Sequence, residues 1–232
     1  MKRLSILTLY ISGILLLAIN VSGFALKDRN AGQNIYTVMS QNITDRGEYL
    51  TKLTEAIAKD ILHLDSRISF YDNYIMWVLG VREFASYNKA ISRGLGLCSQ
   101  HAIIESEILK EQDIPNRIVR LTGHVVLTAE VSPGEWWVLE PDFGFVIPHS
   151  MEEIESNPNI ITKYFYSSFG DVILEGNSAS RLAGIYEKAG NYICNGSGVF
   201  YYRPDLLILE KVSFILIWGI PILMIILAIK LL

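Results

Sequence analysis

Two long stretches without any charged side chain, one near each end, constrain what this chain can fold into. Leu4 to Leu26 and Val212 to Ile229 contain no Asp, Glu, Lys or Arg. A helix needs roughly 20 apolar residues to cross the hydrocarbon core of a bilayer, and both stretches are about that long. Two such segments are too few for a polytopic transporter or channel. The sequence of 232 residues therefore predicts one globular domain between two apolar ends.

The N-terminal stretch is open to two interpretations. Lys2 and Arg3 precede it, which fits the basic start of a secretory signal peptide. Its length, and the lack of a clean small-x-small cleavage site after a short apolar region, favour an uncleaved anchor. We expect residues 1–26 to form a transmembrane anchor or signal segment, 27–205 an extracytoplasmic domain and 206–232 a C-terminal transmembrane helix that tolerates Pro221 as a kink.

The charges of the chain predict its membrane topology and limit the classes of partner that it is expected to bind. Lys2, Arg3 and Lys230 flank the apolar stretches and favour a cytoplasmic side for both termini. Every other charged residue lies between Lys27 and Lys211, and all 24 acidic residues of the chain are among them. Because nucleic-acid affinity comes from Lys and Arg that neutralise phosphates, we expect no nucleic-acid partner. The expected partners are the lipid bilayer and a substrate, and the oligomeric state stays open.

The middle of the chain changes from helical to strand periodicity, which is the pattern of an α+β domain. Apolar spacing predicts helices over Arg46–Leu64, Ser69–Ser92 and Cys98–Gln112. Alternating apolar residues and Gly-containing turns predict strands over Arg117–Thr122, His124–Val131 and Glu135–Leu139. Asp45 is the expected N-cap of the first helix.

Cys98, His124 and Glu140 fall where a thiol nucleophile and its partners would be placed. Cys98 follows a turn with Gly94 and Gly96 and begins a predicted helix, whose positive end favours a thiolate. The glycines would also let a substrate backbone approach closely. His124 begins the second strand and Glu140 ends the third, so an antiparallel hairpin brings the two together. This order predicts a nucleophile, a base and an acid that orients the base.

Five short motifs in series resemble the transglutaminase-like superfamily, which has a papain-like core. The motifs are Gly96-Leu97-Cys98, Ile114-Pro115-Asn116-Arg117, Gly123-His124-Val125, Glu130-Val131 and Trp137-Val138-Leu139-Glu140-Pro141. The resemblance covers about 50 residues and implies helices packed on an antiparallel sheet, with Cys98 as nucleophile, His124 as general base and Glu140 as the orienting carboxylate. It implies a compact, membrane-anchored member of bacterial type.

The sequence departs from the family pattern at three places. The family has Asp before the proline, where this chain has Glu140, and Asp142 is the alternative acid two residues later. Val125 and Val126 follow the histidine where an aromatic residue is frequent. The interval from His124 to Glu130 is longer than usual and suggests a bulge or an extended hairpin.

The resemblance implies acyl transfer through a thioester on Cys98, and a compact membrane-bound form favours hydrolysis of an envelope peptide or conjugate by a peptidase or amidase. The alternative is a catalytically idle module of the same fold that binds a partner at the membrane. No cofactor or metal is expected, because a zinc site built from Cys98, His101 and His124 would lack a fourth ligand. A disulfide between Cys98 and Cys194 would end the enzyme hypothesis.

Overall fold

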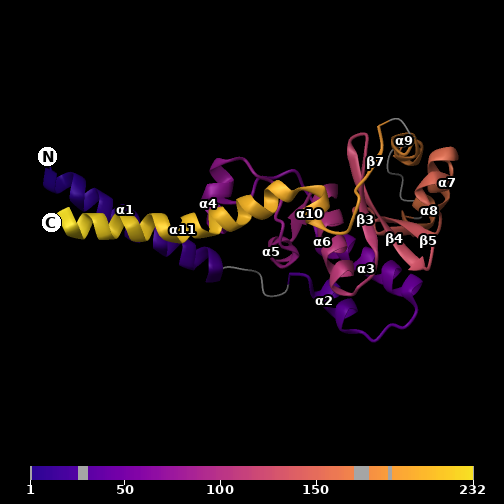
Figure 1. Ribbon diagram of the computed structural model, residues 1–232, viewed down its shortest axis with the longest axis horizontal. Coiled ribbons are helices and arrows are strands. Elements are labelled where there is room, and N and C mark those ends of the chain that lie inside the picture. The colour runs from indigo at the N-terminus through magenta and orange to yellow at the C-terminus, as the bar shows by residue number, and fades with distance from the viewer. Residues whose placement is uncertain (1, 26–30, 170–177, 188–189, 232) are drawn as a thin grey trace. The chain divides into compact units, whose positions relative to one another are not determined.

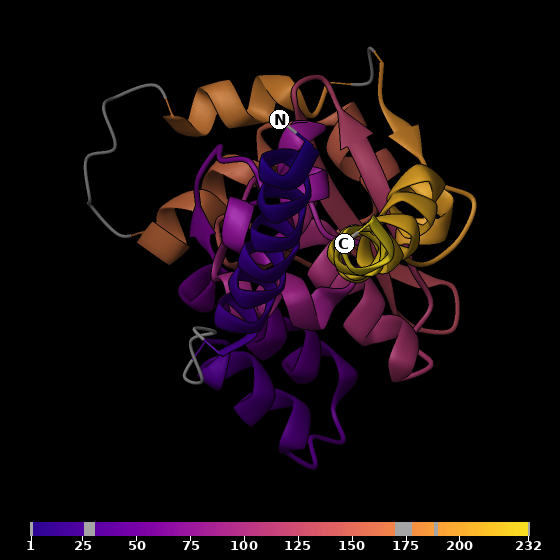
Figure 2. The same cartoon turned by 90° about the vertical axis from the view of Figure 1, so that its left-hand side faces the viewer.

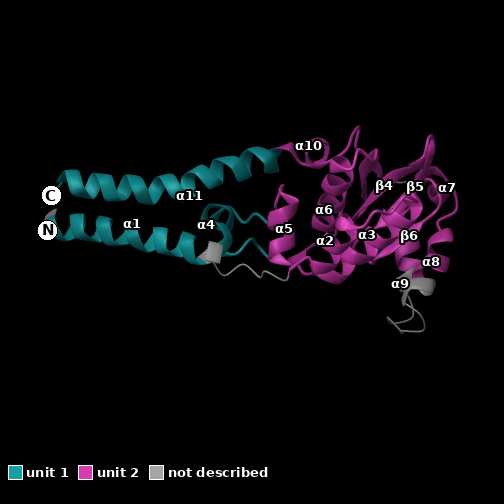
Figure 3. Cartoon of the chain, turned by 90° about the horizontal axis from the view of Figure 1, so that it is seen from below, with its two compact units in different colours: residues 1–29, 66–83, 205–232 teal, residues 30–65, 84–204 magenta. Residues whose placement is uncertain are grey.

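The computed structural model describes residues 2–25, 31–169, 178–187 and 190–231 and has an α+β fold, as predicted. The chain divides into two compact units (Figure 3). One comprises residues 1–29, 66–83 and 205–232, and the other comprises 30–65 and 84–204. Residues 66–83, which the sequence placed within the middle domain, therefore belong with the terminal helices. The domain boundary predicted at residue 26 lies outside the described residues.

The second unit is built on a five-stranded antiparallel sheet in the order β6-β5-β4-β3-β7 (Figure 1). Its strands are β3 (Asn116–Leu121), β4 (His124–Ser132), β5 (Glu135–Glu140), β6 (Phe145–Ile147) and β7 (Tyr192–Ile193). The three predicted strands are thus confirmed. Gly123 and Gly134 sit in the two hairpin turns with φ of 81° and 84°, a backbone region that favours glycine. The β4–β5 register shifts between Glu130 and Ser132, a bulge or irregularity just after the interval for which the sequence suggested a bulge or an extended hairpin.

Helices cover the sheet and complete the core of this unit. They are α2 (Gln33–Ser40), α3 (Arg46–Asp60), α5 (Tyr87–Arg93), α6 (Cys98–Glu111), α7 (Met151–Ser156), α8 (Ile160–Phe169), α9 (Ser178–Ile185) and α10 (Val199–Tyr202). Helix α6 packs against β3 and β4. A separate apolar cluster joins Val119, Val126 and Val138 of the sheet to Ile154 and Phe165 of α7 and α8. The site described below depends on both layers.

Two predicted helices end earlier than their periodicity suggested. The Asp45 side chain accepts a hydrogen bond from the Glu48 amide at 2.7 Å, so the predicted N-cap is confirmed. The helix predicted over Arg46–Leu64 corresponds to α3, which ends at Asp60. The chain then forms β1 (Leu62–His63), which pairs in parallel with β2 (Leu95–Gly96). The predicted helix over Ser69–Ser92 is wrong.

Two shorter helices replace that helix, α4 (Phe70–Val78) and α5. Gly80, with a φ of 69°, lies between them, where the chain turns instead of continuing the helix. The prediction failed because apolar residues recur through this stretch at a helical interval without forming one buried face.

The first unit contains two long apolar helices packed together, α1 (Lys2–Ala25) and α11 (Pro204–Leu231). Helix α1 crosses behind α11 in Figure 1 and runs alongside it in Figure 3, and the N- and C-terminal ends of the chain lie at the same end of the pair (Figures 1 and 2). By length and composition, both helices could cross a membrane. The antiparallel arrangement follows from contacts within the pair: Asn20 bonds to Ile217, whereas Gly13 approaches Pro221 and Ile225.

A proline creates the hydrogen-bond acceptor that joins these helices. Pro221 has no N–H, so it cannot bond to the carbonyl of Ile217 one turn earlier in α11. The Asn20 side-chain amide of α1 donates to that carbonyl at 2.5 Å, and the Tyr74 hydroxyl of α4 donates to it at 3.2 Å. A Cβ at Gly13 would lie 2.9 Å from the Pro221 carbonyl oxygen, so the close approach of the helices requires glycine there.

Restoring the missing amide should make Asn20 less important for stability. We expect Asn20→Leu to lower the free energy of unfolding by about 1 kcal/mol, the usual contribution of a hydrogen bond between apolar helices. In a Pro221→Ala background the loss should shrink, because the restored N–H can donate to the Ile217 carbonyl. Denaturant unfolding in detergent of the four variants of this cycle measures the coupling, with Thr8→Val on the exposed side of α1 as a control. Equal losses in both backgrounds would contradict this account.

Candidate thiol active site

Cys98 is the first residue of α6, and its thiol is free and half-buried. Leu97 has an extended backbone, and its carbonyl accepts from the amides of Gln100 and His101 at 2.9 and 3.2 Å. The helix therefore begins at Cys98, with no side chain capping its first turn. Unpaired amides at a helix start carry partial positive charge, which favours a thiolate at this position.

The two glycines before Cys98 serve the packing of the chain itself; a role in the approach of a substrate stays a prediction. Gly94 ends α5 in the left-handed conformation, with a φ of 67°. A Cβ at Gly96 would lie 2.5 Å from the Cβ of Gln100, so this turn packs tightly on the first turn of α6. The Gln100 side chain in turn bonds to the amide and the carbonyl of Phe84, at 2.7 and 3.1 Å. These contacts fix the turn that presents the thiol.

His124 and Glu140 form a buried pair where β4 begins and β5 ends. Nε2 of His124 lies 2.6 Å from Oε1 of Glu140, and the Glu140 side chain is fully buried. His124 also has a hydrogen bond with Cys98. The Tyr186 hydroxyl, just after α9, donates to the other carboxylate oxygen of Glu140. The structure thus brings the three candidate residues into one chain of contacts and adds a fourth residue; their catalytic roles stay predictions.

The charge on Glu140 sets the protonation of its neighbours. Burial alone would lower the pKa of His124, but the negative charge of Glu140 and the hydrogen bonds to Cys98 and Glu140 outweigh it and raise the pKa to about 11. Burial and the same carboxylate raise the pKa of Tyr186 well above its usual value. At neutral pH the tyrosine is therefore a neutral donor, and the imidazole is protonated between a sulfur and a carboxylate.

Asp142, the alternative acid, lies against a different histidine. The strand ends at Glu140, and the turn that follows is closed by the Gly144 amide bonding to the Glu140 carbonyl at 2.8 Å. Oδ1 of Asp142 lies 2.5 Å from Nδ1 of His63 and 3.6 Å from Nδ1 of His101. The structure thus places Glu140, and not Asp142, beside His124.

His101 is a core residue one turn after the thiol. It is fully buried, and its two ring nitrogens lie 2.9 Å from the carbonyl oxygens of Leu97 and Ile61. His101 therefore ties α6 to the end of α3.

A second buried acid lies two turns further along α6. Burial is the main reason that the pKa of Glu105 rises to about 8; the charge of Glu140 adds to it, and a hydrogen bond from the Thr54 hydroxyl opposes it. That hydroxyl donates to Oε1 at 2.6 Å, whereas Oε2 has no partner. Near neutral pH Glu105 is therefore mostly a neutral carboxylic acid inside the domain.

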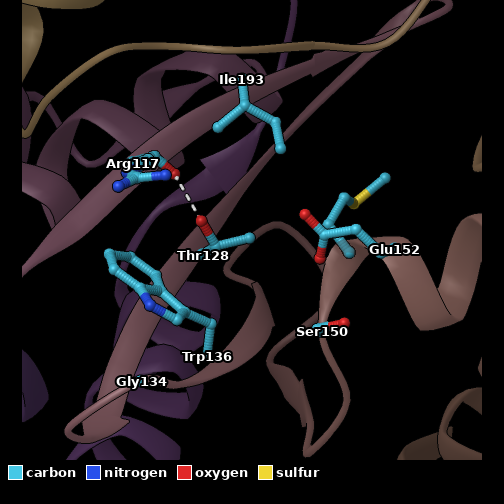
Figure 4. A pocket seen from close by; sticks show the side chains of 8 residues that line it. Arg117, Thr128, Gly134, Trp136, Ser150, Glu152 and Ile193 are labelled. Carbon is cyan, nitrogen blue, oxygen red and sulfur yellow. Dashed lines mark hydrogen bonds between the residues drawn. The ribbon is translucent and has the colours of Figure 1, made fainter.

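The cavity in Figure 4 lies elsewhere on the sheet. Its volume is about 380 Å³, and its lining includes Arg117, Thr128 and Trp136 from the strands and Glu152 from α7. The Arg117 guanidinium lies over the Trp136 ring, 4.6 Å from its centroid. The arginine of the Ile114–Arg117 motif thus packs on the sheet, beside this cavity.

Among the described residues, Cys98 takes part in neither a metal-binding group nor a disulfide. No group of three or more His, Cys, Asp or Glu among them could hold a metal ion. Cys194 is buried and also a free thiol, so the two cysteines do not form a disulfide. Burial raises the pKa of Cys194, which makes it the less reactive of the two.

Removing the Tyr186 hydroxyl should cost stability through Glu140. Tyr186→Phe leaves a buried, charged oxygen without its donor, and a hydrogen bond to a charged group contributes about 1.5–3 kcal/mol. We expect that loss in denaturant unfolding, and a smaller loss in a Glu140→Gln background, where the acceptor is neutral. Tyr192→Phe, at an exposed tyrosine, is the matched control and should change nothing. A loss that is the same with Glu140 and with Gln at that position would show that the hydroxyl does not act through the carboxylate.

Glu105 should make the protein less stable as the pH rises. Its folded pKa is raised from 4.5 to about 8, so its contribution is complete below pH 4.5 and is lost as the pH rises through 8. Glu105→Gln keeps the oxygen that accepts from Thr54 and cannot titrate. The melting temperature of the variant relative to the wild type should therefore increase steadily between pH 5 and pH 8.5. A constant difference across that range would rule out a protonated Glu105.

Comparisons with known proteins do not assign the chain to a family. A scan of protein-family models found no match, and a search of curated proteins found no significant match. The functional conclusion therefore depends on the site itself. That site is a half-buried thiol at a helix start, hydrogen-bonded to a buried histidine–carboxylate pair.

Proposed function

We propose that this protein is a membrane-anchored, transglutaminase-like cysteine enzyme that transfers acyl groups and most readily hydrolyses an amide. The observation that carries the proposal is the contact chain from Cys98 through His124 to Glu140. The helix carrying the thiol packs on an antiparallel sheet carrying the other two residues, which supports the papain-like core that the sequence motifs imply.

The contacts suggest how the reaction would proceed. Cys98, as a thiolate beside the His124 imidazolium, attacks the substrate carbonyl carbon, and the main-chain amide of Cys98 at the start of α6 donates to the developing oxyanion. The imidazolium protonates the leaving amine as the C–N bond breaks, which leaves a thioester on Cys98. Neutral His124 then takes a proton from water, which attacks the thioester. The products are an acid and an amine, and the thiolate–imidazolium pair is restored.

Glu140 and Tyr186 keep His124 in position through this cycle. Glu140 holds one ring nitrogen, so the ring turns its other side to the sulfur, and it stabilises the imidazolium. Tyr186 occupies the second oxygen of Glu140. The acid therefore has no freedom to rotate away when the imidazole loses its charge.

The two apolar helices suggest where the reaction occurs. In the antiparallel pair of α1 and α11, the start of α1 and the end of α11 lie on the same side, and the sequence places Lys2, Arg3 and Lys230 there, which supports both termini in the cytoplasm and the domain outside it. A domain at that place would meet peptides and conjugates of the cell envelope. We therefore propose an envelope peptide or conjugate as the substrate class.

Thiol labelling separates an active site from an idle one. With a small alkylating reagent at neutral pH, Cys98 should react faster in the wild type than in His124→Ala, because a neighbouring imidazolium stabilises the thiolate that attacks the reagent. Cys98→Ser retains only the buried Cys194 and should stay unlabelled on the same timescale. A chromogenic ester should then leave an acyl group on Cys98 that is visible by intact mass.

The labelling result also tests the alternative of a catalytically idle binding module. Labelling of Cys98 no faster than that of a free thiol, with no acyl group from the ester, would support the binding module and contradict the enzyme. Fast labelling that is unaffected by His124→Ala would contradict the proposed base.

A further inference from the structure

We propose that the segment Ser66–Glu83 is a third membrane-contacting element, which dips its tip into the interfacial region of the bilayer beside α1 and α11. This inference depends on the membrane placement of those two helices and not on the thiol chemistry. It assigns a lipid-binding surface to a stretch of the chain that lies far in sequence from both apolar helices.

The segment has a charge-free tip between charged flanks. Residues 73–81 contain no Asp, Glu, Lys or Arg, and Asp72 and Arg82 stand on either side of them. Such a tip is too short to cross a bilayer, which takes roughly 20 residues, but it suits a segment that enters and leaves on the same side. The charged flanks can then remain in water.

Side chains of the segment are bonded to the apolar part of α11. The Asn73 side-chain amide donates to the Ser213 hydroxyl at 2.9 Å, and both groups are buried. The Tyr74 hydroxyl donates to the Ile217 carbonyl that Pro221 leaves free, at 3.2 Å. Helix α4 also packs against α1. These bonds attach the segment to the two helices at a defined depth.

That depth matches the membrane interface. Val212 is the first residue of the charge-free stretch of α11, directly after Lys211. At about 1.5 Å per residue, Ile217 lies about 8 Å further along the helix axis. A segment held at this level lies close to the boundary between headgroups and acyl chains, where Trp and Tyr side chains are enriched.

The side chains that the segment exposes are the ones that this region favours. Tyr71, Trp77, Val78 and Leu79 have 61%, 43%, 68% and 58% of their surface exposed. The Phe70 ring packs edge to face against the Trp77 ring, with 5.4 Å between the ring centroids. An apolar surface of this kind is costly in water, and it is continuous with two helices whose own surface is apolar.

The backbone of the tip is satisfied internally, as a lipid environment requires. Oδ1 of Asn73 accepts from the amides of Ile75 and Met76, both at 3.1 Å, and so caps the second half of α4 where the helix is interrupted. The amides of Leu79, Gly80 and Val81 bond to carbonyls within the segment at 2.9 to 3.1 Å. The Ile68 amide closes the loop onto the Val81 carbonyl at 2.9 Å.

Bilayer quenching of single tryptophans tests the inference. A Trp77-only chain (Trp136→Phe, Trp137→Phe, Trp218→Phe) is reconstituted in phosphatidylcholine vesicles with bromine on the acyl chains, either near the headgroup or near the chain end. We expect Trp77 to lose most of its emission with shallow bromine and less with deep bromine. A Trp136-only chain, whose reporter lies on the sheet, should keep its emission in both.

A Trp218-only chain separates the inference from the membrane placement on which it depends. Trp218 lies within the apolar stretch of α11 and should be quenched by bromine if α11 crosses the bilayer. Quenching of Trp218 without quenching of Trp77 would overturn the inference alone. Quenching of neither would overturn both the membrane placement and the inference. The rate of Cys98 labelling in the same vesicles reports separately on the thiol site.

Discussion

The burial of the Glu140 carboxylate is the constraint on which the site depends. A carboxylate without exposure to water persists only when its oxygens are bonded and its charge is balanced. His124 provides the charge and one hydrogen bond, and Tyr186 provides the other. Because these partners come from β4 and from the chain after α9, a single acid joins the sheet to a late part of the sequence and orients the imidazole toward Cys98.

The domain contains a second buried acid, Glu105, and the two acids differ in charge because their surroundings differ. Glu140 has a cationic partner and two hydrogen bonds, whereas Glu105 has one hydroxyl donor and an oxygen without a partner. The charge of Glu140 further disfavours ionisation of Glu105. The interior thus retains one negative charge, at the place where a positive imidazolium balances it.

Local sequence patterns predicted much of the fold, and they failed where distant contacts decide the outcome. Helix α6, the three central strands and the Asp45 cap follow from periodicity and turn residues. The interruption of α4 at Asn73, by contrast, lies where Asn73 and Tyr74 bond to α11, and no local pattern contains those distant contacts. At the site, the spacing of His124 and Glu140 was informative because hairpin geometry relates their positions. Tyr186 is separated from Glu140 by 46 residues, and His63 and Glu105 carry no motif, so sequence offered no signal for them.

The proline in α11 has a consequence for how the pair of apolar helices can move. The main-chain carbonyls of a helix are normally occupied by amides of the same helix. Here one free carbonyl oxygen, at Ile217, holds donors from two different elements. A shift of α11 by one turn would carry that oxygen about 5.4 Å out of their reach. The lack of an N–H on Pro221 therefore helps to fix the alignment of α1, α4 and α11, together with the Asn73–Ser213 bond and the close contact at Gly13.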